Sequence, residues 1–301
     1  MQPVIDRFRH VLIENDVEII LPPVNERFEE TDLLQCISDI DGVICGDDRF
    51  SERVLLKAKK LKVISKWGTG IDSIDKAACN QLGIAVHNTP NAFSEPVADS
   101  VLGYMLCFAR NLLNMDRRMK EGMWHKVPSR ALRECTLGVV GIGNVGKAVV
   151  RRACAFGMRI LGNDIVEIPA DFQSKTGIQM VTKEVLLPQA DFISLNCDLN
   201  PTSYHLIGDV QFALMKTDAV VINASRGPVI DESSLIKALQ EKRIAGAALD
   251  VFEFEPLPPD SPLRKMDNVL LAPHNSNSSP EAWERVHWNT INNLLDELRK
   301  K

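Results

Sequence analysis

The sequence predicts an α/β protein built from two doubly wound parallel-sheet domains. Short β-branched segments alternate with helical patterns through almost the whole chain of 301 residues, and this alternation is typical of parallel sheets flanked by helices. A glycine-rich turn joins a strand to a helix near the middle of the chain, which is a second feature of such sheets. The length is sufficient for two domains, each with its own apolar core.

Individual elements follow from the hydrophobic periodicity. Strands are expected at 17–21, 41–45, 62–65, 84–87, 136–140, 159–162, 192–195, 219–222, 246–249 and 268–271. Helices are expected at 4–14, 52–60, 74–82, 97–109, 145–156, 232–240 and 280–299. Ser94 is expected to be the N-cap of the helix at 97–109, with Pro96 in its first turn. Ser279 is expected to start the last helix, because Pro280 and Glu281 follow it.

The helix at 97–109 is apolar on nearly every side. One domain cannot easily bury every face of a helix, so we expect part of this one to lie against a second subunit. The sequence therefore predicts a homodimer.

Composition argues against several classes of protein. The net charge of −5 and the pI of about 5.8, with no basic cluster beyond 57–62, argue against a nucleic-acid partner. The seven cysteines are scattered and none has CxxC spacing, so neither a disulfide framework nor a metal site is expected. No segment resembles a signal peptide or is long enough to span a membrane. These features predict a soluble cytoplasmic protein with no membrane partner.

The segment 136–146 is a strand that runs directly into the pattern GxGxxG and then into a helix. Gly141 would permit the tight turn, Gly143 would let a pyrophosphate approach the backbone, and Gly146 would let helix and strand pack closely. Free N–H groups and the helix dipole favour an anion at such a helix N-terminus. The alternative is a glycine turn with only a steric role.

An acidic residue, Asp164, ends the next strand of this unit. A carboxylate at this position accepts hydrogen bonds from the adenosine ribose of a dinucleotide. It would also repel a 2′-phosphate, and the segment 165–167 offers no cation to bind one. The pattern therefore predicts NAD, rather than NADP, as the cofactor.

Three polar residues follow the ends of late strands, where open α/β sheets bind their ligands: Arg226, Glu255 and His274. A histidine can accept the hydroxyl proton of a secondary alcohol as hydride leaves, and a neighbouring carboxylate fixes its tautomer. An arginine can bind the carboxylate of the substrate through two hydrogen bonds, or it can polarise the C2 oxygen. Each residue alone could be structural, as a surface ion pair, a loop acid before Pro256 or a turn residue. Together they predict oxidation and reduction of a small hydroxy acid.

The motifs, taken together, resemble those of the D-isomer-specific 2-hydroxyacid dehydrogenase family, and among its members they are most similar to phosphoglycerate dehydrogenase. The resemblance covers nearly the whole chain and is carried by the segments 67–75, 88–90, 141–146, 223–227, 246–256 and 273–274. It implies an enzyme that transfers a hydride between NAD(H) and C2 of a small D-2-hydroxy acid or 2-oxo acid.

The resemblance also implies the domain organisation. A Rossmann NAD-binding domain, 94–274, is expected to be inserted into a flavodoxin-like substrate-binding domain formed by 1–93 and completed by 275–301. Family members close over substrate in a cleft and dimerise through the segment matching 97–124. The strand that precedes the first helix in the family is expected to be missing here, and no regulatory domain is expected after residue 301.

Roles for individual residues follow from the same resemblance. His274 is the acid and base, Glu255 its partner and Arg226 the substrate anchor. Asn144 and Val145 would lie along the pyrophosphate. The remaining cofactor contacts implied are Cys197 beside the adenosine, Ala224 and Asp250 beside the nicotinamide, and Thr69. The substrate-side residues implied are Lys66, Gly68, Thr69 and Gly70, in addition to Arg226.

The substrate itself stays open. Phosphoglycerate dehydrogenases usually carry an arginine after the strand matching 41–45, whereas this chain has Gly46, Asp47 and Asp48, which would repel a phosphate unless Lys66 or Arg49 compensates. The alternatives are a glyoxylate or hydroxypyruvate reductase, or a non-enzymatic NAD-sensing corepressor built on the same scaffold. Formate dehydrogenases share the fold, but they typically have glutamine in place of Glu255. Turnover would separate the enzyme from the corepressor.

Overall fold

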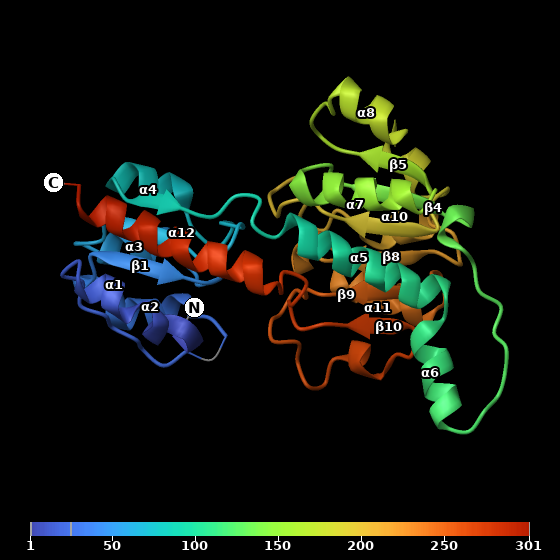
Figure 1. Ribbon diagram of the computed structural model, residues 1–301, viewed down its shortest axis with the longest axis horizontal. Helices are drawn as coiled ribbons and strands as arrows, with labels where there is room; N and C mark the ends of the chain where they lie inside the picture. Colours follow the sequence, from blue (N-terminus) through green and yellow to red (C-terminus); the bar gives the residue numbers. More distant parts are fainter. Residues whose placement is uncertain (1, 25, 301) are drawn as a thin grey trace. The chain divides into compact units, whose positions relative to one another are not determined.

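The computed structural model describes residues 2–24 and 26–300, and the chain divides into two compact units. Unit 1 comprises Met1–Phe93 and Ser279–Lys301, and unit 2 comprises Ser94–Ser278. In Figure 1 the blue beginning and the red end of the chain lie in the same unit. Unit 2 is therefore continuous in sequence, whereas unit 1 is assembled from two separate segments.

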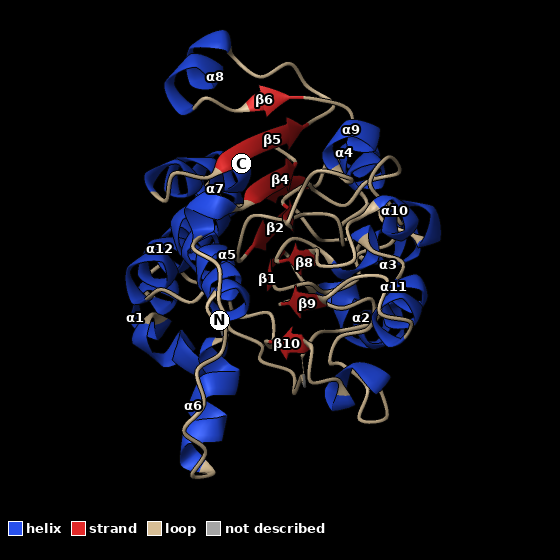
Figure 2. Ribbon diagram, turned by 90° about the vertical axis from the view of Figure 1, so that its right-hand side faces the viewer, coloured by secondary structure: helices blue, strands red, loops and turns tan. Residues whose placement is uncertain are grey.

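Unit 1 contains a parallel three-stranded sheet in the order β1-β2-β3. Its strands are β1 Gly42–Cys45, β2 Val63–Lys66 and β3 Ala85–His87. The connecting helices, α3 Glu52–Lys57 and α4 Lys76–Leu82, lie on one face, and α1 Arg9–Ile13 and α12 Pro280–Leu298 lie on the other (Figure 2). A 3-10 helix at Gln2–Arg7 and α2 Glu30–Cys36 complete the helices before β1.

Helix α12 covers the sheet of unit 1 with its apolar side. The Ser279 hydroxyl accepts a hydrogen bond from the N–H of Ala282, so the helix starts at the predicted residue. Leu294 belongs to a buried cluster that includes Phe8 and Val63. A Cβ atom on Gly42 would lie 2.8 Å from the side chain of Leu294, so only glycine lets α12 approach β1 this closely.

Unit 2 contains a parallel seven-stranded sheet in the order β10-β9-β8-β7-β4-β5-β6. Its strands are β4 Thr136–Val140, β5 Arg159–Asn163, β6 Gln179–Met180, β7 Phe192–Leu195, β8 Val220–Asn223, β9 Gly246–Leu249 and β10 Val269–Leu271. The direction of winding reverses between β4 and β7, which is the topological switch point where such sheets bind ligands. The predicted α/β fold class is confirmed.

Helices cover both faces of this sheet. Figure 2 shows α5 Ser94–Ala109 and α7 Asn144–Ala155 on one face, and α9 Lys183–Leu186, α10 Asp209–Leu214 and α11 Glu232–Gln240 on the other. Strands β7, β8 and β9 are buried along their whole length, which explains their nearly unbroken apolar sequences. The remaining helices are α6 Leu112–Lys120 and α8 Ala170–Thr176.

Helix α6 extends away from the rest of unit 2, and a long loop then returns to β4 (Figure 1). Several large apolar side chains of α6 and this loop are exposed, including Leu113 and, at 85% exposure, Trp124. Among the described residues, no helix combines the length and the apolarity needed to cross a membrane.

Two predicted features are wrong. The segment 17–21 forms no strand in the described structure; Val17 and Ile19 instead pack on the cluster beneath α12, and Ile20 is exposed. A β-branched segment becomes a strand only where a neighbouring strand can pair with its backbone. Ser94 is the first residue of α5 rather than its N-cap. The periodicity also did not predict α2, α6, α8, β6, α9 and α10. All of these except α6 have seven residues or fewer, which is too short to show a period.

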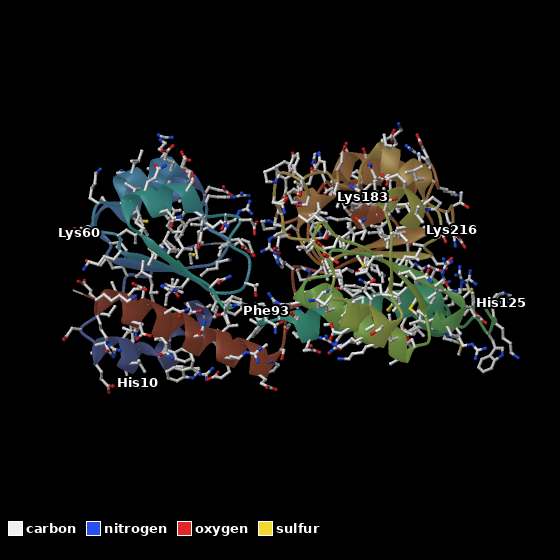
Figure 3. The ribbon with its side chains drawn as sticks, turned by 90° about the horizontal axis from the view of Figure 1, so that it is seen from above. His10, Lys60, Phe93, His125, Lys183 and Lys216 are labelled. Atoms are coloured by element: carbon white, nitrogen blue, oxygen red, sulfur yellow. The ribbon has the colours of Figure 1, made fainter. Side chains whose placement is uncertain are left out.

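Asp191 ties together the amino ends of β4 and β7. It is 6% exposed, accepts a hydrogen bond from the N–H of Thr136, and pairs with Arg130 at 2.9 Å and with Lys216, labelled in Figure 3, at 3.1 Å. Burial opposes ionisation, but these hydrogen bonds and the positive charges outweigh it, so the pKa of Asp191 is lowered.

We expect Asp191→Asn to lower the free energy of unfolding by about 2 kcal/mol near neutral pH, because hydrogen bonds to a charged group contribute about 1.5–3 kcal/mol. Since the pKa of Asp191 is lowered in the folded state, the carboxylate stabilises the fold above its unfolded pKa of about 3.9. That contribution is lost as the pH falls through the folded pKa. Urea unfolding at a series of pH values should therefore show the two proteins converging in acid.

Asp218→Asn is the matched control. Asp218 pairs with the same Arg130 at 3.1 Å, but its side chain is 61% exposed. Exposed pairs contribute about 0–1 kcal/mol, so this variant should change stability little. Equal losses of unfolding free energy in the two variants would show that the buried carboxylate of Asp191 contributes no more than an exposed one.

Candidate functional site

The glycine turn after β4 has three glycines with different physical roles. Gly141 has a φ of +88°, and a Cβ there would lie 2.7 Å from the backbone of Asn196 and Cys197. A Cβ on Gly146 would lie 2.0 Å from the carbonyl oxygen of Gly141. A Cβ on Gly143 would meet nothing within 4 Å. Packing therefore requires the first and third glycines, whereas the middle one leaves open space at the N-terminus of α7.

A cavity of about 720 Å³ lies beside this turn, within unit 2. Three predicted cofactor residues line it, namely Gly141, Asp164 and Cys197. Its volume lies within the range of small-molecule and cofactor pockets. Burial raises the pKa of Cys197 to about 11, so this thiol stays neutral and presents a weakly polar wall. The remaining predicted cofactor residues of the turn, Asn144 and Val145, are the first two residues of α7.

Asp164 follows β5 directly and is held from two sides. One carboxylate oxygen accepts a hydrogen bond from the N–H of Ile142, and the other accepts one from Val166 at 3.0 Å. The carboxylate thus links the glycine turn to the loop after β5. Ile165, which is exposed, also lines the cavity and offers an apolar surface for a base. The sequence prediction used Ile165 only to note the absence of a cation.

Lys183, labelled in Figure 3, brings a cation to the same cavity. It is the first residue of α9, which follows β5 and β6 in the sequence. Sequence reasoning missed it because α9 is a four-residue helix without a pattern of its own.

Arg226 lies in a turn whose shape is set by buried neighbours. Asn223, the last residue of β8, donates a hydrogen bond to the carbonyl oxygen of Arg226 at 2.9 Å and accepts one from the N–H of Ser225 at 3.1 Å. A Cβ on Gly227 would lie 1.9 Å from the carbonyl oxygen of Phe252. The turn that carries Arg226 therefore packs directly against the loop that follows β9. Ala224 lies in the same turn, directly after β8.

The loop after β9 carries Glu255, which contacts His274. The distance from His274 Nδ1 to Glu255 Oε2 is 3.0 Å, and the other carboxylate oxygen accepts a hydrogen bond from the N–H of Phe252 at 3.0 Å. An ionised carboxylate only accepts hydrogen bonds, so Nδ1 carries the proton in this contact. Both side chains are mostly buried.

Asp250 holds the turn on which His274 lies. It is 1% exposed, and its two carboxylate oxygens accept hydrogen bonds from the N–H groups of Asn275 at 2.8 Å and Ser276 at 2.9 Å. The N–H of His274 donates a hydrogen bond to the backbone carbonyl oxygen of Asp250 at 2.7 Å. These bonds fix His274 at a φ of +50°, which non-glycine residues seldom adopt.

A second group of polar residues holds the loop that carries Glu255 through hydrogen bonds to Glu253. The imidazole Nε2 of His205 hydrogen bonds to the carboxylate of Glu253, and Tyr204 stacks on the same ring at 4.0 Å. The N–H of Glu253 donates to the carboxylate of Glu232 at 3.2 Å, and burial followed by repulsion from Glu253 raises the pKa of Glu232. We call His205, Glu232 and Glu253 the loop clamp. Sequence reasoning missed it because its members are far apart in the chain.

The predicted substrate-side residues lie in unit 1. Lys66 is the last residue of β2, is 4% exposed, and pairs with Asp47 at 2.8 Å. Gly68 has a φ of +124°, and the hydroxyl of Thr69 donates to the carbonyl oxygen of Thr89 at 3.0 Å. Gly70 ends the same turn. Within unit 2 the structure brings Glu255 and His274 into contact, and the turn that carries Arg226 packs against the loop that carries Glu255.

Comparisons with known proteins are consistent with this geometry. The family described as D-isomer specific 2-hydroxyacid dehydrogenase, NAD binding domain, matches residues 102–276. A glyoxylate reductase of Korarchaeum cryptofilum is 40% identical over 271 residues, which are 87% of this chain and 81% of that protein. A D-3-phosphoglycerate dehydrogenase of Methanocaldococcus jannaschii is 43% identical over 255 residues, which are 83% of this chain and 48% of that protein. The crystal structure of D-lactate dehydrogenase from Aquifex aeolicus, complexed with NAD and lactic acid, has a TM-score of 0.87 and 26% identity and covers 99% of this chain and 95% of that chain.

Gly146 and Gly143 allow a matched test, because the first is required for packing and the second leaves space for a ligand. We expect Gly146→Ala to destabilise the protein by about 3 kcal/mol, because overpacking against backbone forces the helix away from the strand. Gly143→Ala should change stability by less than about 0.5 kcal/mol, since its Cβ meets nothing. The same methyl group would occupy the space that a pyrophosphate approaches, so the Kd for NADH should rise about tenfold. Urea unfolding and fluorescence titration with NADH measure the two effects; unchanged NADH binding in Gly143→Ala would count against this location.

Proposed function

Because the chain belongs to the D-isomer specific 2-hydroxyacid dehydrogenase family, it is an NAD-dependent oxidoreductase, and we propose that His274, Glu255 and Arg226 carry its chemistry. The reaction is hydride transfer at C2 of a small D-2-hydroxy acid or the corresponding 2-oxo acid. The observation that carries the proposal is the contact between Glu255 and Nδ1 of a mostly buried imidazole, on a loop that packs against the turn of Arg226.

His274 is the proton donor for reduction and the proton acceptor for oxidation. When bound, NADH supplies the hydride that C2 receives. Nε2 of the protonated imidazole donates its proton to the C2 oxygen, which would otherwise carry a full negative charge. Glu255 stabilises the imidazolium and keeps the Nδ1–H tautomer afterwards, so the ring does not need to rotate between turnovers.

Arg226 is the proposed anchor for the substrate carboxylate. A guanidinium forms two parallel hydrogen bonds with a carboxylate, which orients C2 as well as binding the acid. Asn223 and Gly227 fix the backbone on either side of Arg226, so the anchor is placed before substrate arrives. Lys66, Gly68, Thr69 and Gly70 are the substrate-side residues proposed in unit 1.

The cofactor contacts are proposed to lie around the cavity of unit 2. The N–H groups at the start of α7, including those of Asn144 and Val145, would bind the pyrophosphate, and Asp164 would bind the adenosine ribose. Cys197 would lie beside the adenosine, and Ala224 and Asp250 beside the nicotinamide. Thr69 completes the proposed set. The corresponding domains are 94–274 for NAD and 1–93, completed by 275–301, for substrate.

A non-enzymatic NAD-sensing protein is the competing interpretation, since it would keep the same three polar residues. Removal of the acid and base separates the two. We expect His274→Ala to lower kcat by about 10²–10⁴ for 2-oxo acids while the Kd for NADH changes little, because general acid–base catalysis contributes that much. Stopped-flow NADH oxidation and fluorescence titration give the two values. His10→Ala, at the exposed position labelled in Figure 3, is the control and should match the unmodified protein.

Glu255→Gln sharpens this test through its pH dependence. Reduction requires a protonated imidazole, and an amide stabilises the imidazolium less well than a carboxylate does. The rate of reduction in this variant should therefore begin to fall at a lower pH than in the unmodified protein. An unchanged pH profile, or normal turnover in His274→Ala, would show that other residues perform the proton transfer. Absence of turnover with any 2-oxo acid in the unmodified protein would favour the NAD-sensing alternative.

We further propose that the protein is a cytoplasmic homodimer. The segment 97–124 supports the dimer, because Tyr104 and Phe108 on α5 are only half buried and the apolar side chains of α6 are exposed. His125, labelled in Figure 3, follows this apolar segment in the loop that returns to β4. The seven unpaired cysteines support a reducing compartment.

Light scattering tests the dimer. We expect a particle of twice 33.5 kDa at micromolar concentration, and we expect the double variant Leu113→Asp and Trp124→Asp to shift it to the monomer mass, because two buried charges would oppose association. Val210→Asp is the control, since Val210 is an exposed apolar residue of the same unit on α10. A monomer mass for the unmodified protein would contradict the proposal.

A further inference from the structure

The carboxyl ends of the three strands of unit 1 meet at one edge of its sheet. β1 ends at Cys45, β2 at Lys66 and β3 at His87, and all three strands are parallel. Ligands of open α/β sheets bind outside this edge. The charges on the loops that leave it therefore decide which end groups a substrate can carry.

The cation at this edge is already paired. Lys66 is 4% exposed, whereas the side chain of its partner Asp47 is 42% exposed, and their charged atoms are 2.8 Å apart. A molecule that approaches from solvent therefore meets the carboxylate before the ammonium group. The pair as a whole contributes no net positive charge.

The backbone of the same loop is occupied by a second carboxylate. Asp48 is 8% exposed, and its two oxygens accept hydrogen bonds from the N–H of Gly46 at 2.8 Å and from the N–H of Phe28 at 2.7 Å. Loop N–H groups of this kind are what proteins use to bind a phosphate. Here the protein's own carboxylate takes that place.

The neighbouring arginines do not give this edge of the sheet a net positive charge. Arg27 and Arg49 share Glu29, at 2.8 Å and 3.8 Å. The formal charges of these three residues together with Lys66, Asp47 and Asp48 cancel. A phosphomonoester carries a charge of about −1.5 to −2 near neutral pH, so its recognition needs a clear excess of positive charge.

We propose that Asp47 and Asp48 form a charge filter that excludes 2-oxo acids with a second anionic group. The substrate class that remains is the short, unphosphorylated 2-oxo acid, such as glyoxylate or hydroxypyruvate. This inference rests on the proposed function and narrows it. Specificity of this kind arises from a repulsive element as much as from an attractive one.

The experiment compares hydroxypyruvate with 3-phosphohydroxypyruvate, which differ only in the phosphate. We expect kcat/KM for hydroxypyruvate to be higher by about 100-fold or more, because like charges brought together cost several kcal/mol. Asp47→Asn removes one negative charge and leaves Lys66 positive. It should raise kcat/KM for the phosphorylated acid relative to hydroxypyruvate by about tenfold, mainly through KM.

Asp41→Asn is the matched control. Asp41 and Lys62 form the same kind of pair at 3.3 Å, but they precede β1 and β2 and so lie at the opposite, amino edge of the sheet. This variant should leave the preference between the two acids unchanged. Asp41 and Lys62 are both exposed, so Asp41→Asn should fold normally. Asp47→Asn leaves the buried Lys66 without its counter-charge and should lower stability, so thermal unfolding must first show that this variant is folded at the assay temperature.

Either of two kinetic outcomes would overturn the filter: comparable kcat/KM for the two acids in the unmodified protein, or equal effects of Asp47→Asn on both. Calorimetric binding of the two acids to the protein saturated with NAD⁺, which cannot reduce them, tests the filter independently of turnover. Preferential binding of hydroxypyruvate without turnover of any 2-oxo acid would support the filter and refute the proposed enzymatic function. Preferential binding of the phosphorylated acid would refute the filter alone.

Discussion

The buried carboxylate of Asp250 is the interaction on which the reactive edge of unit 2 depends. An unpaired carboxylate at 1% exposure would be strongly destabilising, and the N–H groups of Asn275 and Ser276 offset that cost only if the chain turns immediately after β10. This turn places His274 within reach of Glu255. Glu255 is in turn positioned by the loop clamp and by the close contact of Gly227 with the backbone of Phe252. The position of His274, the proposed proton-transfer group, therefore depends on backbone packing more than on its own side-chain contacts.

The two units use carboxylates in opposite ways. In unit 2, Asp164 and Asp250 accept backbone hydrogen bonds beside a cavity and a turn that suit a cofactor and a reacting group. In unit 1, Asp48 accepts the same kind of hydrogen bond where a loop would otherwise be free to bind an anion. The same local chemistry therefore supports the proposed cofactor site in one sheet and the proposed exclusion of anions in the other. The difference lies in which N–H groups remain available.

Elements could be predicted from the sequence where the local pattern of residues favours the same structure as the overall fold. The strand, turn and helix at 136–155 could be predicted because glycine spacing, strand composition and helical period coincide there, and the same holds for α12. The segment 17–21 has strand composition but no partner strand in the described structure, and composition cannot reveal that. Arg226, Glu255 and His274 could be singled out because each follows a strand. The loop clamp, the place of Lys183 and the Lys66–Asp47 pair could not, because each depends on residues that only the folded chain brings together.

The division of unit 1 into two segments affects how the chain folds as it is synthesised. Unit 2 is continuous and can fold as soon as its last strand has emerged from the ribosome. The sheet of unit 1 is made first, but its cover, α12, is made last. Until then the apolar surface around Phe8 and Val63 has no helix to bury it. The segment of unit 1 that precedes unit 2 is therefore translated before α12 but reaches its final packing only after it, and its apolar surface needs protection from aggregation in the meantime.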